Sequence, residues 1–145
     1  MQEISAKIIK DSIGSHGVRL TTFQVRVPKF LLAELNTHRV FSRSYNSSRA
    51  IPGYKIRNQV VADPYTPIYW GKNKPGMQAL SDLSGFKLAV AKAIYKSSAL
   101  SAAAHHWCLD KIGLHKQHLN RIVEPYMMAD GVITGCDWDN FFDLR

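Results

Sequence analysis

The sequence predicts a single α+β domain, in which an antiparallel β-sheet has a long helical segment packed against it. Two segments rich in β-branched residues, 3–10 and 18–27, come first and are joined by the turn residues of SIGSHG. A long stretch with helical periodicity, 77–112, follows later in the chain. A chain of 145 residues with 46% hydrophobic residues is long enough to bury one core, so we expect one domain over residues 1–145.

The first half of the chain is predicted to hold a hairpin, a helix and a loop. The alternation in VRLTTFQVRV favours a strand that pairs with 3–10, and Pro28 ends this strand and suits the first turn of a helix through KFLLAELN. Residues 52–77 read as a long irregular connection, a kind of segment that is often functional. This connection contains the prolines Pro52, Pro64, Pro67 and Pro75.

The second half is predicted to be mainly helical. A single helix over 77–112 would reach roughly 50 Å, so we consider a break near Gly85 or at Ser97–Ser98. A further helix is expected from 115 to 124, where Pro125 stops it. An apolar strand in GVITG and the start of a helix at 137–144 complete the prediction.

Composition restricts the partners of the protein. The formal net charge of +8 favours anionic partners, without choosing among nucleic acids, nucleotides and phosphorylated cofactors. No apolar run is long enough to span a bilayer, and MQEISAKIIK lacks the apolar segment of a signal peptide. Cys108 and Cys136 do not make a disulfide framework, so we expect a cytoplasmic protein, and we interpret Cys136 as a small buried apolar residue.

The stretch NTHRVFSRSYNSSRAIP, residues 36–52, concentrates three arginines, one histidine and five serines and threonines. Arginine side chains bind phosphate oxygens two at a time, and a run of small residues lets backbone N–H groups converge on an anion. The alternative is a basic helix end that complements the helix dipole. One cation would be enough for that purpose, so the density of donors favours an anion site.

This stretch resembles the signature of the flavin-dependent thymidylate synthases. That signature is Arg-His-Arg, seven variable residues, a serine and, two positions further on, an arginine. Here Thr37-His38-Arg39 is followed by seven residues, Ser47 and Arg49. RLTTFQVRVPKFLLAELNTHRVFSRS, YWGKNKPGMQAL, GLHKQHLNRIVEPY and DWDNFFDLR also resemble the bacterial and phage branch of the family, in the same order. The resemblance covers nearly the whole chain.

The resemblance implies a flavin-dependent thymidylate synthase-like fold and the activity of a FAD-dependent thymidylate synthase. Members of the family methylate dUMP to dTMP with methylenetetrahydrofolate and NADPH, and their flavin sites lie between the subunits of a homotetramer. The flavin does the chemistry without an enzyme nucleophile, so the protein has mainly to position its ligands. The expected partners are therefore dUMP, the folate and other copies of the chain, and not a membrane or a nucleic acid.

The resemblance also assigns site residues. The residues matched to flavin contacts are His38, Arg39, Val40 and Asn140. The residues matched to contacts with the nucleotide are Ser47, Ser48, Arg49, Arg121 and Arg145. Ser47, Ser48 and Arg49 match a loop that binds the phosphate and sugar of the nucleotide. Arg145 matches an arginine that recognises the uracil edge.

The sequence departs from the family pattern in several places, among them Ser44 and Tyr45, where an asparagine and a glutamate are common. Thr37 replaces the first arginine of the motif, and Arg43 is expected to compensate for it. TGCDW occupies the place of an asparagine-alanine-arginine motif, so no flavin contact is assigned over 134–138. The sequence ends at Arg145, where family members continue with further helices, either because it is truncated or because this is a naturally short form, and we expect slow turnover or none from this length of chain alone.

Other interpretations stay open. A basic nucleic-acid-binding module would use the charge and the loop aromatics Tyr65, Tyr69 and Trp70, and a catalytically silent relative would keep the fold but bind no flavin. The loop aromatics would otherwise pack the loop or stack on a ring system. His105, His106 and Cys108 are nearly consecutive on a predicted helix and point to different sides, which favours helix packing over a metal site.

Overall fold

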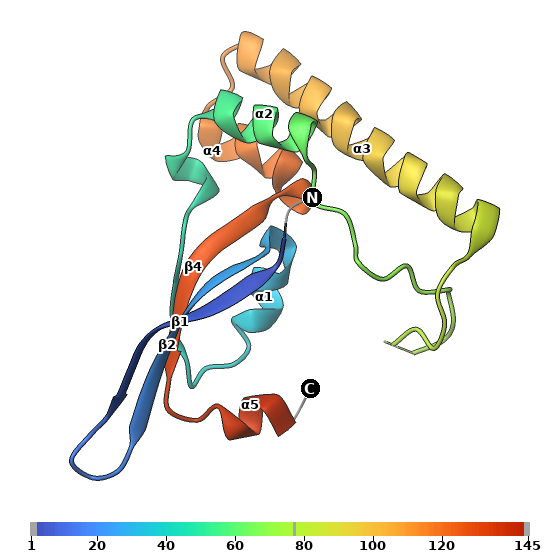
Figure 1. Ribbon diagram of the computed structural model, residues 1–145. Helices are drawn as coiled ribbons and strands as arrows, with labels where there is room; N and C mark the ends of the chain where they lie inside the picture. The colour runs from blue at the N-terminus through green and yellow to red at the C-terminus, as the bar shows by residue number, and fades with distance from the viewer. Residues whose placement is uncertain (1–2, 77, 144–145) are drawn as a thin grey trace.

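The computed structural model describes residues 3–76 and 78–143. The chain is an α+β domain whose four-stranded antiparallel sheet carries a group of helices at one end (Figure 1), which confirms the predicted fold class. The strand order is β1-β2-β4-β3. The strands are β1 (Ser5–Ile13), β2 (Arg19–Pro28), β3 (Ser42–Tyr45) and β4 (Met128–Gly135).

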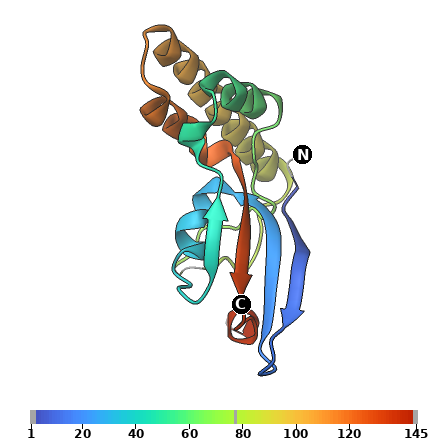
Figure 2. The ribbon, with the colours of Figure 1, turned by 90° about the vertical axis from the view of Figure 1, so that its left-hand side faces the viewer.

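The centre of the sheet is formed by strands from opposite ends of the sequence. β1 and β2 form the predicted hairpin, with a register shift between Ile8 and Lys10. β4 pairs with β2 from Thr21–Gly135 to Pro28–Met128 and with β3 on its other side, as the face-on view of Figure 2 shows. β4 thus begins three residues before the predicted GVITG segment, and it carries the C-terminal part of the chain into the middle of the sheet.

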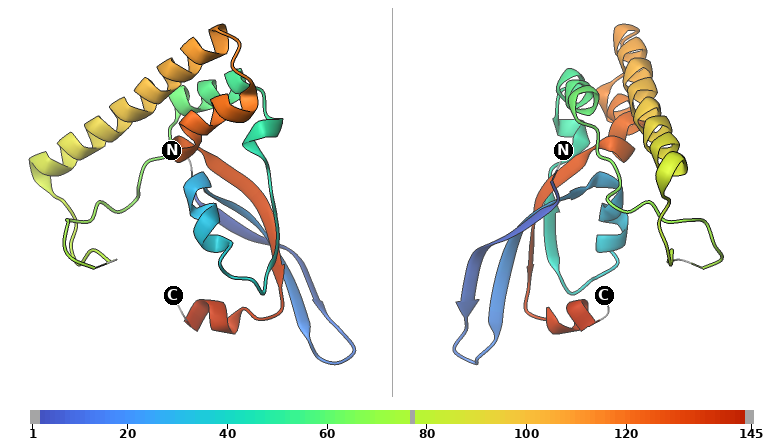
Figure 3. Two further views of the ribbon diagram at one scale, coloured as in Figure 1. Left: turned by 180° about the vertical axis from the view of Figure 1, so that it is seen from behind. Right: turned by 45° about the vertical axis from the view of Figure 1, so that its right-hand side comes forward.

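The two faces of the sheet differ in chemistry. One face carries the side chains of Val25 and Ile133 and is partly covered by α1 (Leu32–Leu35) and α5 (Asp139–Asp143), which lie on the same side in Figure 3. The opposite face is polar, with a hydrogen bond of 2.9 Å between the hydroxyls of Thr22 and Thr134. This alternation follows from the two-residue period of a strand, and it directs the apolar residues toward α5.

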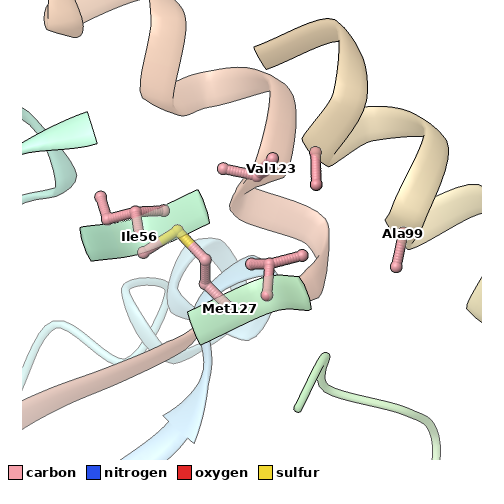
Figure 4. Close-up of a cluster of buried hydrophobic side chains, with 6 residues drawn as sticks. Ile56, Ala99, Val123 and Met127 are labelled. Atoms are coloured by element: carbon pink, nitrogen blue, oxygen red, sulfur yellow. The ribbon is translucent and has the colours of Figure 1, made fainter. Parts of the chain in front are cut away.

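The helices at the end of the sheet enclose a second core. They are η2 (Ser48–Ala50), α2 (Gly53–Ala62), α3 (Gly85–Lys111), α4 (Lys116–Leu119) and η3 (Asn120–Tyr126), where η marks a 3-10 helix. Ile56, Val123 and Met127 are buried against the alanines of α3 (Figure 4). Ala99 and Ala103 lie one turn apart on α3, and their small side chains allow α2 and η3 to approach closely. α3 thus packs on other helices, beyond the end of the sheet.

Helix α2 corrects the prediction of an irregular connection over 52–77. Pro52 occupies its N-cap position, and Ile56 and Val60 are spaced by four residues on its buried face. The remaining residues of α2 combine good helix formers, such as Lys55, Arg57 and Gln59, with Gly53 and Asn58, which have low helix propensity. Tertiary burial of these two side chains, Ile56 and Val60, stabilises the helix, and their four-residue spacing is a weak local signal among the prolines and glycines of 52–77.

The later helices also differ from their predicted bounds. α3 begins at Gly85, which confirms the break considered there, and not near 77. It continues through Ser97–Ser98 without the other break, and the hydroxyl of Ser98 donates to the Ile94 carbonyl at 3.0 Å. The predicted helix over 115–124 is divided into α4 and η3, and η3 extends past Pro125 to Tyr126. No helix within the described residues is both long and apolar enough to cross a membrane.

Candidate functional site

The stretch 36–52 connects the two cores of the molecule. It leaves α1, runs along β3 and passes through η2 to the first turn of α2. His38, Arg39 and Val40 precede β3, whereas Ser47–Arg49 follow it. β3 has four residues, which span about 13 Å at 3.3 Å per residue. The two halves of the motif therefore belong to two neighbouring sites, one beside α5 and one beside η3.

The first half of the motif lies against an aromatic cluster, made of Phe23, Phe41, Trp138, Phe141 and Phe142. The His38 ring meets the Phe141 ring edge-on, with centroids 5.0 Å apart. This contact brings the 38–40 segment to α5, which also carries Asn140. The structure therefore gathers the residues predicted to contact the flavin around one end of the sheet, although they are about a hundred residues apart in the sequence.

Gly135 makes this arrangement possible. The Phe41 ring stacks on Trp138 with centroids 4.3 Å apart, and a Cβ placed on Gly135 would lie 2.4 Å from the Phe41 ring. The indole nitrogen of Trp138 donates to the Gly135 carbonyl at 2.9 Å. The TGCDW segment, for which the resemblance assigned no role, thus forms part of the wall. An apolar cavity of about 180 Å³ lies beside it, between β2 and α5.

Arg43 serves the end of a helix. Its Nη1 donates to the carbonyl of Leu35 at 2.8 Å and also to the carbonyl of His38. These carbonyls lie at and just beyond the C-terminus of α1, where backbone acceptors have no partner within the helix. Nη1 of Arg43 is therefore committed to the end of α1, and compensation by this arginine for Thr37 stays a prediction. The helix-end interpretation of the motif applies to this arginine.

Tyr45 follows on the same strand and is half-buried. Burial raises the pKa of its phenol, and the nearby charge of Arg43 acts in the opposite direction. Its Oη has no hydrogen-bond partner among the described residues. The phenol is therefore neutral at physiological pH and acts as an apolar part of the wall.

The second half of the motif is tied to η3 by polar contacts. Ser48 is buried, and its hydroxyl donates to Oε1 of Glu124 at 2.5 Å. Oε2 of the same carboxylate accepts from Nη1 of Arg121 at 3.3 Å. Ser47 and Arg49 are exposed on either side of Ser48. Glu124 therefore brings the predicted nucleotide loop and Arg121 together, at a place where neither segment is a neighbour of the other in the sequence.

Two arginines of the motif keep their charges available. Arg39 and Arg49 are exposed, and neither makes a salt bridge or side-chain hydrogen bond to any residue of 3–76 or 78–143. Arg121 has 61% of its side chain exposed despite its contact with Glu124. These cations lie on the surface, where they attract an anion without the cost of burying an unpaired charge. Arg145 lies outside the described residues.

The histidines and cysteines considered in the sequence differ in their exposure. His106 is buried, whereas His105 and Cys108 are exposed on other sides of α3. The described residues contain no group of three or more His, Cys, Asp or Glu side chains arranged for a metal ion. Cys136 is exposed, so its interpretation as a buried apolar residue is wrong: it follows the end of β4, where the chain turns outward toward α5.

The loop aromatics mostly pack the loop. The Trp70 ring meets Tyr95 of α3 edge-on at 5.6 Å, and Tyr65 is buried with its backbone N–H bonded to the Tyr126 carbonyl. Tyr69 alone among the three predicted loop aromatics is strongly exposed, at 78%. Packing therefore accounts for Trp70 and Tyr65, and a ring-stacking role is left for Tyr69.

Sequence reasoning missed Asn120, Glu124, Gly135 and Trp138, which hold the site together. Asn120 and Glu124 lie in LNRIVEP, on either side of the predicted Arg121. The three-residue spacing of Arg121 and Glu124 was a signal that these opposite charges could pair on one helical face. For Gly135 and Trp138 the sequence carried no comparable signal, because the partner Phe41 is distant in the chain.

Comparison with known proteins establishes the fold. The sequence matches no protein-family model and no curated protein. The structure is similar to two crystal structures of PolB, a UMP/dUMP methylase from Streptomyces cacaoi. With 5-Br UMP bound, the TM-score is 0.73 and the identity 16%, over 94% of this chain and 73% of that chain. With 5-Br dUMP bound, the TM-score is 0.73 and the identity 15%, over 94% and 74%. At this identity the likeness shows a shared fold.

Proposed function

We propose that this protein is a FAD-dependent thymidylate synthase, which methylates dUMP to dTMP with methylenetetrahydrofolate and NADPH. The observation that carries the proposal is that Glu124, through its contacts with Ser48 and Arg121, holds the loop 47–49 beside Arg121 and leaves Ser47 and Arg49 exposed there. The family resemblance independently matches this loop and Arg121 to a single nucleotide. A similar fold in a UMP/dUMP methylase supports the same substrate class.

The residues around α5 are suited to FAD. Arg39 is exposed and provides a cation for the diphosphate, and the Asn140 amide offers both a donor and an acceptor. His38 lies on the aromatic cluster, where a flat ring system finds apolar surface. When bound, FAD supplies the hydride and mediates the methylene transfer. The task of this chain is then to hold the cofactor and the nucleotide in a fixed mutual position.

A homotetramer is part of the proposal, and the surface of the chain supports it. The accessible surface is 10012 Å², against about 7,500 Å² expected for a compact monomer of 16.4 kDa. Part of this surface is apolar, since Ile8, Ile13 and Leu20 of the hairpin are exposed. Association of identical chains would bury these residues, and it would complete flavin sites of which each chain provides only one side.

The decisive experiment combines a spectrum with an assay. We expect the purified protein to be yellow, with a flavin absorption band, and to form dTMP from dUMP when methylenetetrahydrofolate, FAD and NADPH are present. The same assay with UMP measures how strongly the sugar is selected, since both nucleotide types occur in the similar structures.

Two results would exclude the proposal in different ways. A colourless protein that still binds dUMP stoichiometrically would identify a relative without flavin chemistry. Binding of single-stranded nucleic acid that strengthens with strand length and weakens steeply with salt, without a mononucleotide site, would identify a nucleic-acid-binding module.

A further inference from the structure

Two fully buried polar side chains lie beneath the predicted nucleotide loop. His106 of α3 and Asn120 of η3 are each 0% exposed, and Nε2 of the histidine lies 3.1 Å from Oδ1 of the asparagine. Buried polar groups are retained in proteins mainly where they are hydrogen-bonded, because an unpaired buried polar group destabilises the folded state. This His106–Asn120 pair takes no part in the binding contacts described above.

The pair holds the backbone of the loop. Nδ2 of Asn120 donates to the carbonyl of Ser48 at 2.7 Å and to the carbonyl of Ile51 at 3.0 Å. Both hydrogens of the amide are therefore used, on the two carbonyls that flank Arg49 and Ala50. The turn itself contributes a further bond, from the N–H of Ala50 to the Ser47 carbonyl at 3.0 Å. A single side chain thus fixes both ends of η2.

The hydrogen bonds determine the role of Nε2 of the histidine, whereas its Nδ1 is buried without a hydrogen-bond partner among the described residues. Since Nδ2 of Asn120 is a donor to two carbonyls, its Oδ1 faces His106 as an acceptor. Nε2 of His106 therefore carries the hydrogen, and it fixes which way the amide is turned. An amide turned the other way would place its oxygen against two carbonyl oxygens. His106 thus makes Asn120 competent to hold the loop.

The surroundings of the pair are tightly packed. A Cβ placed on Gly53, the first residue of α2, would lie 3.1 Å from Cε1 of His106 and 3.3 Å from Oδ1 of Asn120. The glycine backbone therefore closes over the pair, which has no access to a ligand. Any influence on binding must act through the loop.

We propose that the His106–Asn120 pair is a positioning device that sets the nucleotide-binding arginines in a fixed relation. Asn120 precedes Arg121 in the chain and holds the two carbonyls around Arg49. One amide thus links the backbones that carry both arginines, so that their guanidinium groups meet the same phosphate group. The identity of that phosphate as the one in dUMP rests on the proposed function, but the fixing of the loop does not.

The test compares four variants with the wild-type full chain. Asn120→Ala removes both hydrogen bonds to the loop, and His106→Leu removes the donor that orients the amide. Gly53→Ala adds a methyl group in close contact with both side chains of the pair. His106→Gln is the matched control, because the glutamine amide nitrogen can donate from about the position of Nε2. Binding of dUMP and of uncharged deoxyuridine is measured by calorimetry, and amide hydrogen exchange is measured at Ala50 and Ile51.

The expected pattern separates positioning from general damage. Asn120→Ala and His106→Leu should weaken dUMP binding by about tenfold or more, the equivalent of one lost buried hydrogen bond, and leave deoxyuridine binding within about twofold. The amides of Ala50 and Ile51 should exchange about tenfold faster, while those of β2 keep their protection and show that the variants are folded. Gly53→Ala should also weaken dUMP binding and speed the exchange at Ala50 and Ile51. His106→Gln should resemble the wild type in both measurements.

Other results would overturn the proposal. Unchanged exchange at Ala50 and Ile51 in Asn120→Ala would show that the pair does not fix the loop. Faster exchange with unchanged dUMP binding, or with equal losses of dUMP and deoxyuridine, would show that the loop does not position a phosphate. If the wild-type protein binds no dUMP, the proposed function fails, and the exchange rates alone decide whether the pair holds the loop.

Discussion

The hydroxyl of Ser48 donates a hydrogen bond to Oε1 of Glu124, although 76 residues separate the two in the sequence. The same carboxylate accepts from Arg121, so one side chain joins two segments that the resemblance assigned to a single nucleotide. The bond also turns the serine hydroxyl inward, while Ser47 and Arg49 stay exposed. Sequence similarity assigns all three loop residues to the substrate, whereas the structure gives them different environments.

Ser47 and Ser48 should therefore respond differently to truncation. Ser48→Ala removes a hydrogen bond to a charged group and should lower the free energy of unfolding by about 1.5–3 kcal/mol. Ser47→Ala should leave stability within about 0.5 kcal/mol and weaken dUMP binding. Urea unfolding and calorimetry of both variants provide the measurement. Equal stability of the two variants would contradict the inward position of the Ser48 hydroxyl.

Arg49 and Arg121 should each contribute to binding of the nucleotide phosphate. Loss of a charge-assisted contact costs about 1.5–3 kcal/mol, or roughly one to two decades in affinity. Calorimetry of dUMP against Arg49→Ala and Arg121→Ala is the test. Lys111→Ala, which removes an exposed cation in the last turn of α3, is the matched control and should leave the affinity unchanged. Wild-type affinity in both arginine variants would refute the assignment.

Arg39 should be required for retention of FAD and not for folding. It is exposed and makes no side-chain contact by salt bridge or hydrogen bond within the described part of the chain, so Arg39→Ala should leave the melting temperature of the flavin-free protein unchanged. The ratio of flavin absorbance to protein absorbance should fall, whereas Lys10→Ala on β1 should leave it unaltered. His38→Ala should lower both the absorbance ratio and the melting temperature of the flavin-free protein, since the His38 ring packs against Phe141.

Gly135 should tolerate no side chain. In Gly135→Ala the new methyl group would meet the Phe41 ring at 2.4 Å, and overpacking of this kind costs typically about 1–3 kcal/mol. The matched control is Gly14→Ala in the hairpin turn, where the nearest atom would be the Val18 carbonyl oxygen at 3.6 Å, an ordinary contact distance. Urea unfolding of the two variants should therefore differ by at least about 1 kcal/mol. Similar values would show that Phe41 moves aside without cost.

The hairpin should show an acid-sensitive ion pair. The hydrogen bonds from Arg19 lower the pKa of Asp11 from 3.8 to about 2, and a bond from Thr21 acts in the same direction. Because the pKa is lower in the folded state, the stabilisation is complete above pH 3.8 and is lost as the pH falls toward 2. NMR titration of the Asp11 carboxyl group should give a midpoint near 2, and Arg19→Gln should return it toward 3.8. An unaltered midpoint in that variant would contradict the assigned cause.

Local patterns in the sequence are sufficient for some elements. The alternation in VRLTTFQVRV predicts β2 because a strand buried on one face repeats every two residues, and the alanine spacing predicts the packed face of α3. The resemblance marks His38 and Ser48 as parts of binding segments, and the structure places each beside a long-range partner. Whether those segments bind FAD and dUMP stays a prediction until it is measured.

Other features have no local cause. The sequence predicts an irregular loop in place of α2, because the stability of this helix comes from Ile56 and Val60, whose burial depends on α3 and η3. The prediction of a buried Cys136 fails because its environment depends on the turn of the chain after β4. The contacts of Nη1 of Arg43 with two carbonyls at the end of α1 depend likewise on the folded position of β3.

The fold class, the hairpin, the long helix and the cationic motif can all be read from the amino-acid sequence, because they depend on periodicity and on residue types within short windows. The three-dimensional arrangement was needed to show which charges remain exposed, which hydroxyl is turned inward, and how Asn120 and Glu124 hold the loop. The reason is physical: each of these features is a contact between segments far apart in the chain. Such a contact exists only after the intervening residues have folded and excluded water from it.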